Sequence, residues 1–232
     1  EKIHTFNRFY LLGSILTSLL IPFLNFEIIK EIPIEVSETV TVEGIISNQA
    51  VFIKEETSVL PLIIWSFYSL ITFGFFIRFG KNILKLISKI KTNPTVQYQN
   101  ANLILLDEKI LPHTFLNSIF INVDDYNHRN IEDELYTHEL VHVTQRHTFD
   151  ILFIEILKTI FWFNPLFYLY KKAIQLNHEF LADEEVVRSC DNVPFYQNLL
   201  LQKNSINHVF LTSNINYLVT KKRLIMMTKN TS

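Results

Sequence analysis

Two stretches of the chain are apolar on every side and contain no charged residue. One reads FYLLGSILTSLLIPFLNF over 9–26, and the other reads TSVLPLIIWSFYSLITFGFFI over 57–77. A helix needs roughly 20 apolar residues to cross the hydrocarbon core of a bilayer. The alternative, a core helix of a soluble protein, would show one polar face. The pattern therefore predicts transmembrane helices over 9–26 and 57–78.

The charged residues that flank these stretches predict their orientation. Lys2 and Arg8 precede the first, and a basic run follows the second: Arg78, Lys81, Lys85, Lys89 and Lys91. Residues 27–56, between the two, carry seven Glu against two Lys. Positive residues stay on the cytoplasmic side of a membrane. We therefore expect a cytoplasmic flank over 1–8, an extracytoplasmic loop over 27–56 with a small hairpin in EVSETVTVEGII, and a cytoplasmic chain from residue 79 onward.

The pattern changes after the second apolar stretch. GKNILKLISKIKT, 80–92, has the spacing of an amphipathic helix at the membrane surface, ended by Asn93-Pro94. LILL and SIFINV are typical of short strands and predict a β-hairpin. SIFINV is either an exposed edge that binds a peptide as an added strand or part of a plain hairpin beneath helices. IEDELYTHELVHVTQRHT then predicts a helix over 131–148.

Composition narrows the function classes. With 232 residues, a mean hydropathy of +0.18 and 48% hydrophobic residues, the chain is typical of membrane segments that alternate with polar ones. The net charge of −2 gives no indication of a nucleic-acid surface, so no direct nucleic-acid partner is expected. The single cysteine, Cys190, cannot form an internal disulfide.

The motif HELVH, which begins at His138, is the clearest chemical signal. His138 and His142 lie at i and i+4, so both imidazoles project from one face of a helix and can bind one Zn²⁺. Glu139 is rotated around the helix axis, where it can act as a general base without binding the metal. The alternative is an ordinary polar helix turn, because so short a pattern also arises by chance.

A catalytic zinc needs a third protein ligand, and QLNHEFLADEE, 175–185, supplies candidates on a second predicted helix. Glu179 and Asp183 share one face of it. Glu179 is predicted to complete the site, and Asp183 to accept a hydrogen bond from a ligand imidazole. His178 is a rival ligand that points off this face. The alternative is a solvated acidic helix face.

The other histidines fit a metal site less well. The longer motif HExxHxxGxxH is absent, because Gln145 and Thr148 stand where it needs Gly and His. His147 is out of register by one position, so it is predicted to lie on the surface or behind a ligand. Four more are predicted to be ordinary polar residues: His4, His113, His128 and His208.

The apolar segment 151–170 is predicted to turn back rather than cross the membrane. Glu155 and Lys158 interrupt it, its uncharged part is too short to span, and Asn164-Pro165 breaks a helix. A crossing would also separate Glu179 from HELVH. We therefore predict a buried or re-entrant hairpin that returns to the same side, with the site at the cytoplasmic edge of the bilayer.

These motifs together resemble the membrane-embedded zinc metallopeptidases typified by the β-lactam sensor-transducers, the BlaR/MecR family. The resemblance rests on THELVH, FWFNPL and HEFLADEEV and is strongest over 131–190. KKRLIMM and RFYLLGS also resemble family segments, the latter in versions from Bacteroidetes-type bacteria. Carried over by position, the resemblance implies the ligands His138, His142 and Glu179, with Glu139 as base and Asp183 as orienting residue. Family members have further spans on both sides, so the chain is expected to be a fragment.

The resemblance implies a mainly α membrane protein with a small α+β part. Its parts are two transmembrane helices, a gluzincin-like zinc peptidase domain over 79–220, and a basic segment, 221–232, before a further span. Residues 191–232 are mostly helical in pattern and carry no recognisable chemistry. We expect a multi-pass protein of the bacterial inner membrane whose active site faces the cytoplasm. The sequence does not predict an oligomeric state.

The function implied by the resemblance is signal-dependent proteolysis. The partners would be membrane lipid and a protein substrate, either a cytoplasmic repressor or the chain itself. An S-x-x-K motif accompanied by K-T-G is absent, so β-lactam sensing is not implied. Two alternatives stay open, a housekeeping zinc peptidase and a non-catalytic receptor or scaffold with a structural zinc. A transporter is disfavoured, because the spans carry no ionisable residue.

Overall fold

Two long apolar helices flank a small helical domain in the computed structural model, which describes residues 2–24, 58–190, 192–206 and 213–229. They are α1 (Lys2–Leu20), extended by the 3-10 turn η1 (Ile21–Phe23), and α2 (Leu60–Thr92). Both are long and apolar enough to cross a membrane. α2 continues unbroken to Thr92, so the second predicted span and the predicted surface helix form one helix. The predicted loop 27–56 and its hairpin lie outside the described residues.

A four-stranded mixed sheet follows α2. Its strands are β1 (Thr95–Tyr98), β2 (Ala101–Leu106), β3 (His113–Phe115) and β4 (Ser118–Asn122), in the order β1-β2-β4-β3. The predicted pairing is wrong, because LILL and SIFINV lie in β2 and β4, which pair in parallel rather than as a hairpin. SIFINV is also not an edge. All five residues of β4 are buried, as is typical of an internal strand, and β3 forms the edge beside it.

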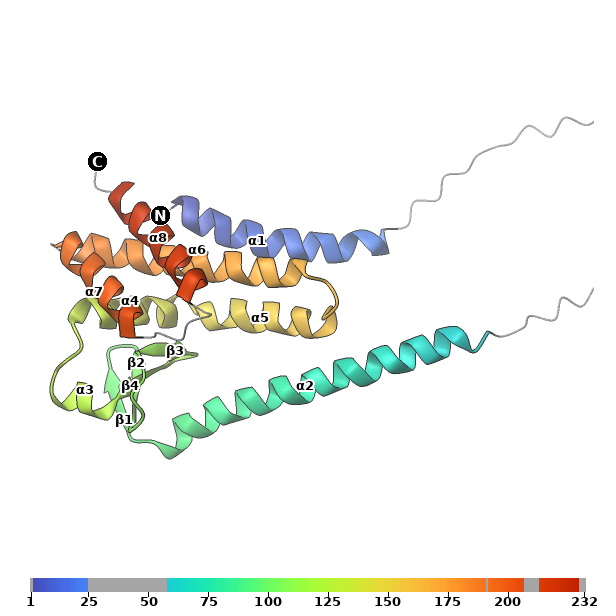
Figure 1. Ribbon diagram of the computed structural model, residues 1–232, viewed down its shortest axis with the longest axis horizontal. Helices are drawn as coiled ribbons and strands as arrows, with labels where there is room; N and C mark the ends of the chain where they lie inside the picture. Colours follow the sequence, from blue (N-terminus) through green and yellow to red (C-terminus); the bar gives the residue numbers. More distant parts are fainter. Residues whose placement is uncertain (1, 25–57, 191, 207–212, 230–232) are drawn as a thin grey trace, which may run out of the picture.

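Six helices complete the described part of the chain, and most of them are stacked on one side of the sheet (Figure 1). They are α3 (Val123–Asn127), α4 (Asp133–Thr144), α5 (His147–Ile160), α6 (Leu166–Ser189), α7 (Val193–Ile206) and α8 (Ser213–Lys229). α4 lies between the sheet and α6, with Val143 packed against Ile119 and Ile121. On the other side of α4, Leu135 joins Val186 of α6 and Tyr196 of α7 in a second apolar cluster.

The helix predicted over 131–148 is interrupted at its end. Gln145 closes α4, Arg146 has a φ of 54° in the left-handed region, and α5 begins at His147. A left-handed residue other than Gly costs about 1–3 kcal/mol, so it persists only where surrounding contacts hold it. This break ends α4 and separates it from α5.

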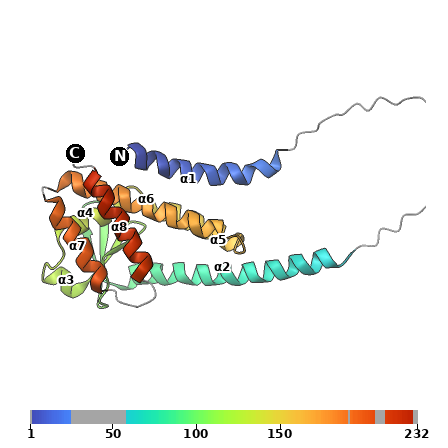
Figure 2. The same ribbon diagram turned by 45° about the horizontal axis from the view of Figure 1, so that its top comes forward.

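The predicted hairpin over the segment 151–170 is confirmed. α5 and α6 pack side by side and are joined by residues 161–165, so the chain returns toward the sheet (Figures 1 and 2). The tip of this hairpin reaches α2 within its apolar part, where the Tyr68 hydroxyl donates a hydrogen bond to the Ile160 carbonyl. α1 packs along α6 through Ile15, which contacts a cluster containing Ile154 and Ile174. The hairpin is therefore packed between the two candidate spans.

Candidate metal centre

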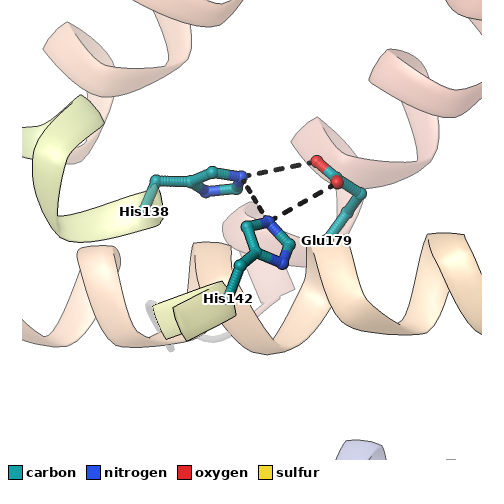
Figure 3. A group of neighbouring side chains, drawn as sticks. All are labelled: His138, His142 and Glu179. Carbon is teal, nitrogen blue, oxygen red and sulfur yellow. Dashed lines mark hydrogen bonds and ion pairs between the residues drawn. The ribbon is translucent and has the colours of Figure 1, made fainter. Parts of the chain in front are cut away.

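Three side chains from α4 and α6 converge on one point (Figure 3). Nε2 of His138 lies 3.3 Å from Nε2 of His142. The carboxylate of Glu179 lies 3.5 Å from Nε2 of His138 and 3.7 Å from Nε2 of His142. Within the described residues this is the group of His, Cys, Asp and Glu side chains whose donor atoms are close enough to hold one metal ion.

These three separations fit a tetrahedral zinc. Ligand atoms about 2.0–2.1 Å from a zinc at tetrahedral angles lie roughly 3.3–3.4 Å from one another. The observed 3.3, 3.5 and 3.7 Å are close to that value without any rearrangement of the backbone. Two imidazole nitrogens and one carboxylate are also a donor set that zinc prefers. The residues present therefore fit a zinc ion.

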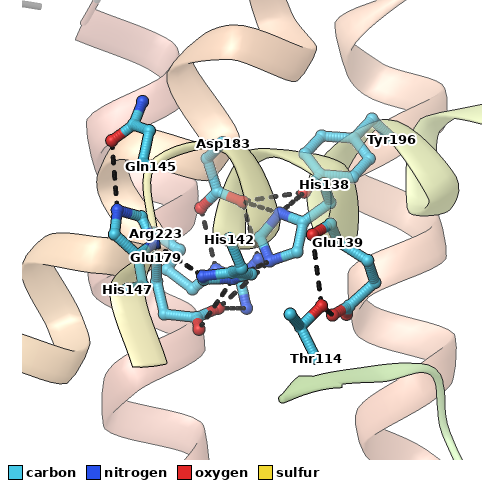
Figure 4. Close-up of polar contacts among 10 residues, drawn as sticks. All are labelled: Thr114, His138, Glu139, His142, Gln145, His147, Glu179, Asp183, Tyr196 and Arg223. Carbon is cyan, nitrogen blue, oxygen red and sulfur yellow. Dashed lines mark hydrogen bonds and ion pairs between the residues drawn. The ribbon is translucent and has the colours of Figure 1, made fainter. Parts of the chain in front are cut away.

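His138 is oriented from behind by a buried polar cluster (Figure 4). Its Nδ1 lies 2.9 Å from the Tyr196 hydroxyl and 3.3 Å from Oδ1 of Asp183. The Tyr196 hydroxyl donates to the same Asp183 oxygen at 2.7 Å. Because Nδ1 is held on this side, Nε2 faces His142 and Glu179.

Arg223 of α8 joins the two carboxylates of α6. Its Nε and Nη2 donate to the two oxygens of Asp183 at 2.8 and 2.6 Å, a bidentate pair. Its Nη1 lies 2.6 Å from Oε2 of Glu179. The Asp183 side chain is fully buried, and that of Arg223 is only 12% exposed. Arg223 therefore supplies the positive charge that these carboxylates need in the interior.

In the metal-free centre, the two imidazoles have very different pKa values. Burial lowers the pKa of His138, but the hydrogen bonds with Asp183 and Glu179 outweigh burial and raise this pKa to about 9. Burial, reinforced by the adjacent His138, lowers the pKa of His142 to about 3. Burial opposes ionisation of Glu179, but Arg223 and the imidazoles hold its pKa well below its usual range. At neutral pH, His138 is therefore protonated and His142 is neutral.

We expect the metal-free protein to lose stability as the pH rises from about 6.5 to about 9. The pKa of His138 in the folded state lies above its ordinary value of 6.5, so its contribution is fully present below 6.5 and is lost through about 9. The pKa of Asp183 is lowered, so the stability that Asp183 contributes is lost only as the pH falls into the acid range. Thermal unfolding across this range measures the effect, and the control variant His138→Gln should lack it. A flat wild-type profile would contradict this assignment.

Glu139, the predicted base, is buried beside the centre and is held by the edge strand β3. The Thr114 hydroxyl lies 2.8 Å from Oε2 of Glu139 and 3.1 Å from the Glu139 carbonyl oxygen (Figure 4). Glu139 is not among the three residues whose donor atoms converge. Its carboxylate is therefore placed next to the centre and outside the ligand set.

The centre opens into a large cavity of about 910 Å³. Its walls include Phe79 of α2, Thr114 of β3, Leu152 of α5, and both His142 and Glu179. The Glu179 side chain is 29% exposed, whereas that of His138 is 8% exposed. One side of the centre is therefore accessible from the cavity, as a catalytic metal requires and a closed structural site does not.

The structure brings together the predicted ligands His138, His142 and Glu179 and places Asp183 behind His138. The rival His178 does not join them. It lies 2.8 Å from Asp150 through Nε2 and stacks on His147 at a centroid distance of 3.9 Å. His147 is not on the surface, since it is only 3% exposed, and its Nδ1 lies 2.8 Å from Nδ1 of His142.

Sequence reasoning missed three residues of the centre, Thr114, Tyr196 and Arg223. The last two lie in the segment 191–232, for which the sequence predicts no chemistry. α8 also runs across the domain boundary predicted at residue 220 and packs against α6 and α7. Buried carboxylates need a positive charge nearby. Glu179 and Asp183 on one helix face therefore indicate that a cationic side chain lies close to them.

Comparison with known proteins gives one family. Residues 114–227 match the family model described as BlaR1 peptidase M56. The matched range begins at Thr114 in β3 and extends through Arg223 in α8, so it contains every residue of the centre described above. A search of curated proteins finds no match.

Proposed function

Because the chain belongs to the BlaR1 peptidase M56 family, a family of metallopeptidases, we propose that it is a zinc endopeptidase centred on His138, His142 and Glu179. The observation that carries this proposal is the mutual spacing of the three donors, 3.3, 3.5 and 3.7 Å, which suits tetrahedral zinc. When bound, zinc supplies Lewis-acid activation of water and of the scissile carbonyl.

In this proposal the chain's own residues move the proton and position the reacting groups. Glu139 accepts a proton from the attacking water and delivers it to the leaving amine. Its position beside the ligands, fixed by Thr114 and by its place next to His138 on α4, supports that role. Asp183 and Tyr196 keep the His138 ring in the orientation that presents Nε2 to the metal.

The edge strand β3 is the proposed docking site for the substrate backbone. Among the described strands, β3 pairs only with β4, and its residues His113, Thr114 and Phe115 line the cavity. A peptide in extended form can add to such an edge through main-chain hydrogen bonds. This strand lies directly against Glu139, so an added peptide would pass the base and the metal ligands.

A catalytic centre is favoured over a structural zinc in a non-catalytic scaffold. A structural site is closed by four protein ligands. The group found in the described residues has three, and the Glu179 carboxylate is exposed to the cavity. A zinc bound by these three residues would therefore be able to bind water or substrate as well.

We further propose that the peptidase acts in signal transduction at the bacterial inner membrane. The basic residues after the second apolar stretch support a cytoplasmic centre. The resemblance to antirepressor peptidases supports a cytoplasmic repressor, or the chain itself, as the substrate. α1 and α2 would carry the signal, since both contact the hairpin that bears Glu179. A housekeeping peptidase is the competing function.

Cleavage by the purified chain in detergent tests the enzymatic proposal. The zinc-loaded wild type should cut candidate repressors or a pool of fluorogenic peptides. A chelator should abolish cleavage, and added zinc should restore it. His142→Ala should be inactive, whereas the matched control His128→Ala, at an exposed position on the surface, should retain activity. Cleavage that survives chelation or the His142 substitution would contradict a zinc peptidase. Cutting of many peptides but no repressor would favour the housekeeping function.

A further inference from the structure

A series of polar contacts connects α1 to the back of the candidate ligand His142. Nδ1 of His142 lies 2.8 Å from Nδ1 of His147, and Nε2 of His147 lies 3.0 Å from Oε1 of Gln145. The main chain of Gln145 is tied to α1, because Nη2 of Arg8 donates to its carbonyl oxygen at 2.9 Å. Arg8 also donates from Nε to Asp150 of α5 at 2.6 Å.

These contacts depend on the break between α4 and α5. On a continuous helix, residues five apart point about 140° away from each other, so His147 could not contact His142. The left-handed Arg146 turns the chain and brings the two rings to a centroid distance of 4.9 Å. Arg8 stabilises this turn from both sides, through the carbonyl of Gln145, which follows the last residue of α4, and through Asp150 in the first turn of α5.

The hydrogen-bond pattern is consistent in only one direction. If Nε2 of His142 binds a metal, its Nδ1 carries the proton and donates it. Nδ1 of His147 must then accept, which leaves the His147 proton on Nε2, where the Oε1 of Gln145 accepts it. His147 thus fixes both the tautomer and the ring plane of His142.

We propose that Arg8 and His147 are positioning residues that hold His142 in place, so that the position of α1 sets the metal affinity of the centre. The inference rests on the proposed function, because it requires metal binding by the triad. It gives the first candidate span a defined physical action on the site. A movement of α1 that withdraws Arg8 releases the α4–α5 turn, and the His142 ring loses its acceptor.

The test measures metal affinity of the full chain by titration of the metal-free protein in detergent with Co²⁺. His147→Leu, which removes the acceptor, should bind about 10–100-fold more weakly, and Arg8→Gln should bind about tenfold more weakly. His147→Asn should stay near wild type, because its side-chain oxygen can accept from Nδ1 of His142. The matched control Ser14→Ala removes a contact of α1 with Tyr170 that does not reach His142, so its affinity should not change.

Two further readouts separate positioning from general loss of structure. The visible absorption band of bound Co²⁺ should shift in His147→Leu and Arg8→Gln and stay unchanged in Ser14→Ala. The effects of Arg8→Gln and His147→Leu should be non-additive in the double variant, because both act through one contact path. If His147→Leu fails to fold, the comparison of Arg8→Gln with Ser14→Ala, in Co²⁺ affinity and in absorption band, tests the same inference.

The outcomes distinguish this inference from the proposed function. Wild-type affinity and an unshifted band in both Arg8→Gln and His147→Leu would overturn the inference. If Glu179→Ala lost metal binding in the same experiment, the proposed metal centre would still stand. Failure of the wild type to bind metal, or full binding by Glu179→Ala, would instead overturn the proposed function.

Discussion

Replacing Glu139 by Gln is expected to lower the peptidase rate by about 10²–10⁴-fold while metal affinity stays near that of the wild type. Gln has the same shape, so it can keep the place beside Thr114, but it cannot accept a proton from water. It also lies outside the group of converging donors, so the metal should remain. Single-turnover cleavage and metal content of the same preparation measure the two effects.

The matched control is Glu134→Gln, which removes a carboxylate from the same helix at a position whose side chain accepts a hydrogen bond from Cys190, a residue that is not part of the centre. It should cleave at the wild-type rate. Full cleavage by Glu139→Gln, or complete loss of its metal, would show that Glu139 does not act as the base.

Arg223→Met is expected to destabilise the metal-free protein by about 3–5 kcal/mol. The substitution removes the cation that pairs with Glu179 at 2.6 Å and with Asp183 at 2.6 and 2.8 Å, and leaves two adjacent carboxylates without it. Zinc should restore part of the lost stability, because it places a new positive charge beside Glu179. Denaturant unfolding in detergent, with and without zinc, gives both values.

The exposed neighbour Lys221→Met is the control, since it removes a positive charge from the same helix outside the site. It should change stability little. Arg223→Lys should lie between the two, because an ammonium keeps the charge but not the bidentate geometry. Equal stability of Arg223→Met and Lys221→Met would show that Arg223 does not balance the buried carboxylates.

The local part of the centre could be predicted from the sequence, and the distant part could not. Helical spacing alone places His138 and His142 on one face, and the same spacing places Glu179 with Asp183. The requirement that Glu179 reach the two imidazoles also predicts the α5–α6 hairpin. Arg223 lies 40 residues beyond Asp183, and no local spacing relates them, so only the packing of α8 on α6 reveals their contact.

The errors in the fold have a similar origin. β3 is only three residues long, too short for an alternating pattern, so the sequence pattern does not reveal it and predicts instead that LILL and SIFINV pair as a hairpin. The break at Arg146 has no Gly or Pro to mark it, because an arginine occupies the left-handed position. Since this break is what brings His147 to His142, the role of His147 could not be read from its position in the sequence.

Zinc-edge X-ray absorption of the purified, zinc-loaded chain tests the central claim most directly. We expect one zinc per chain, with two nitrogen ligands at about 2.0–2.1 Å, a carboxylate oxygen at about 2.0–2.2 Å and one further oxygen from solvent. His138→Ala, His142→Ala and Glu179→Ala should each lose this spectrum, whereas His178→Ala should keep it. A zinc closed by four protein ligands, or one that persists unchanged without Glu179, would contradict the account.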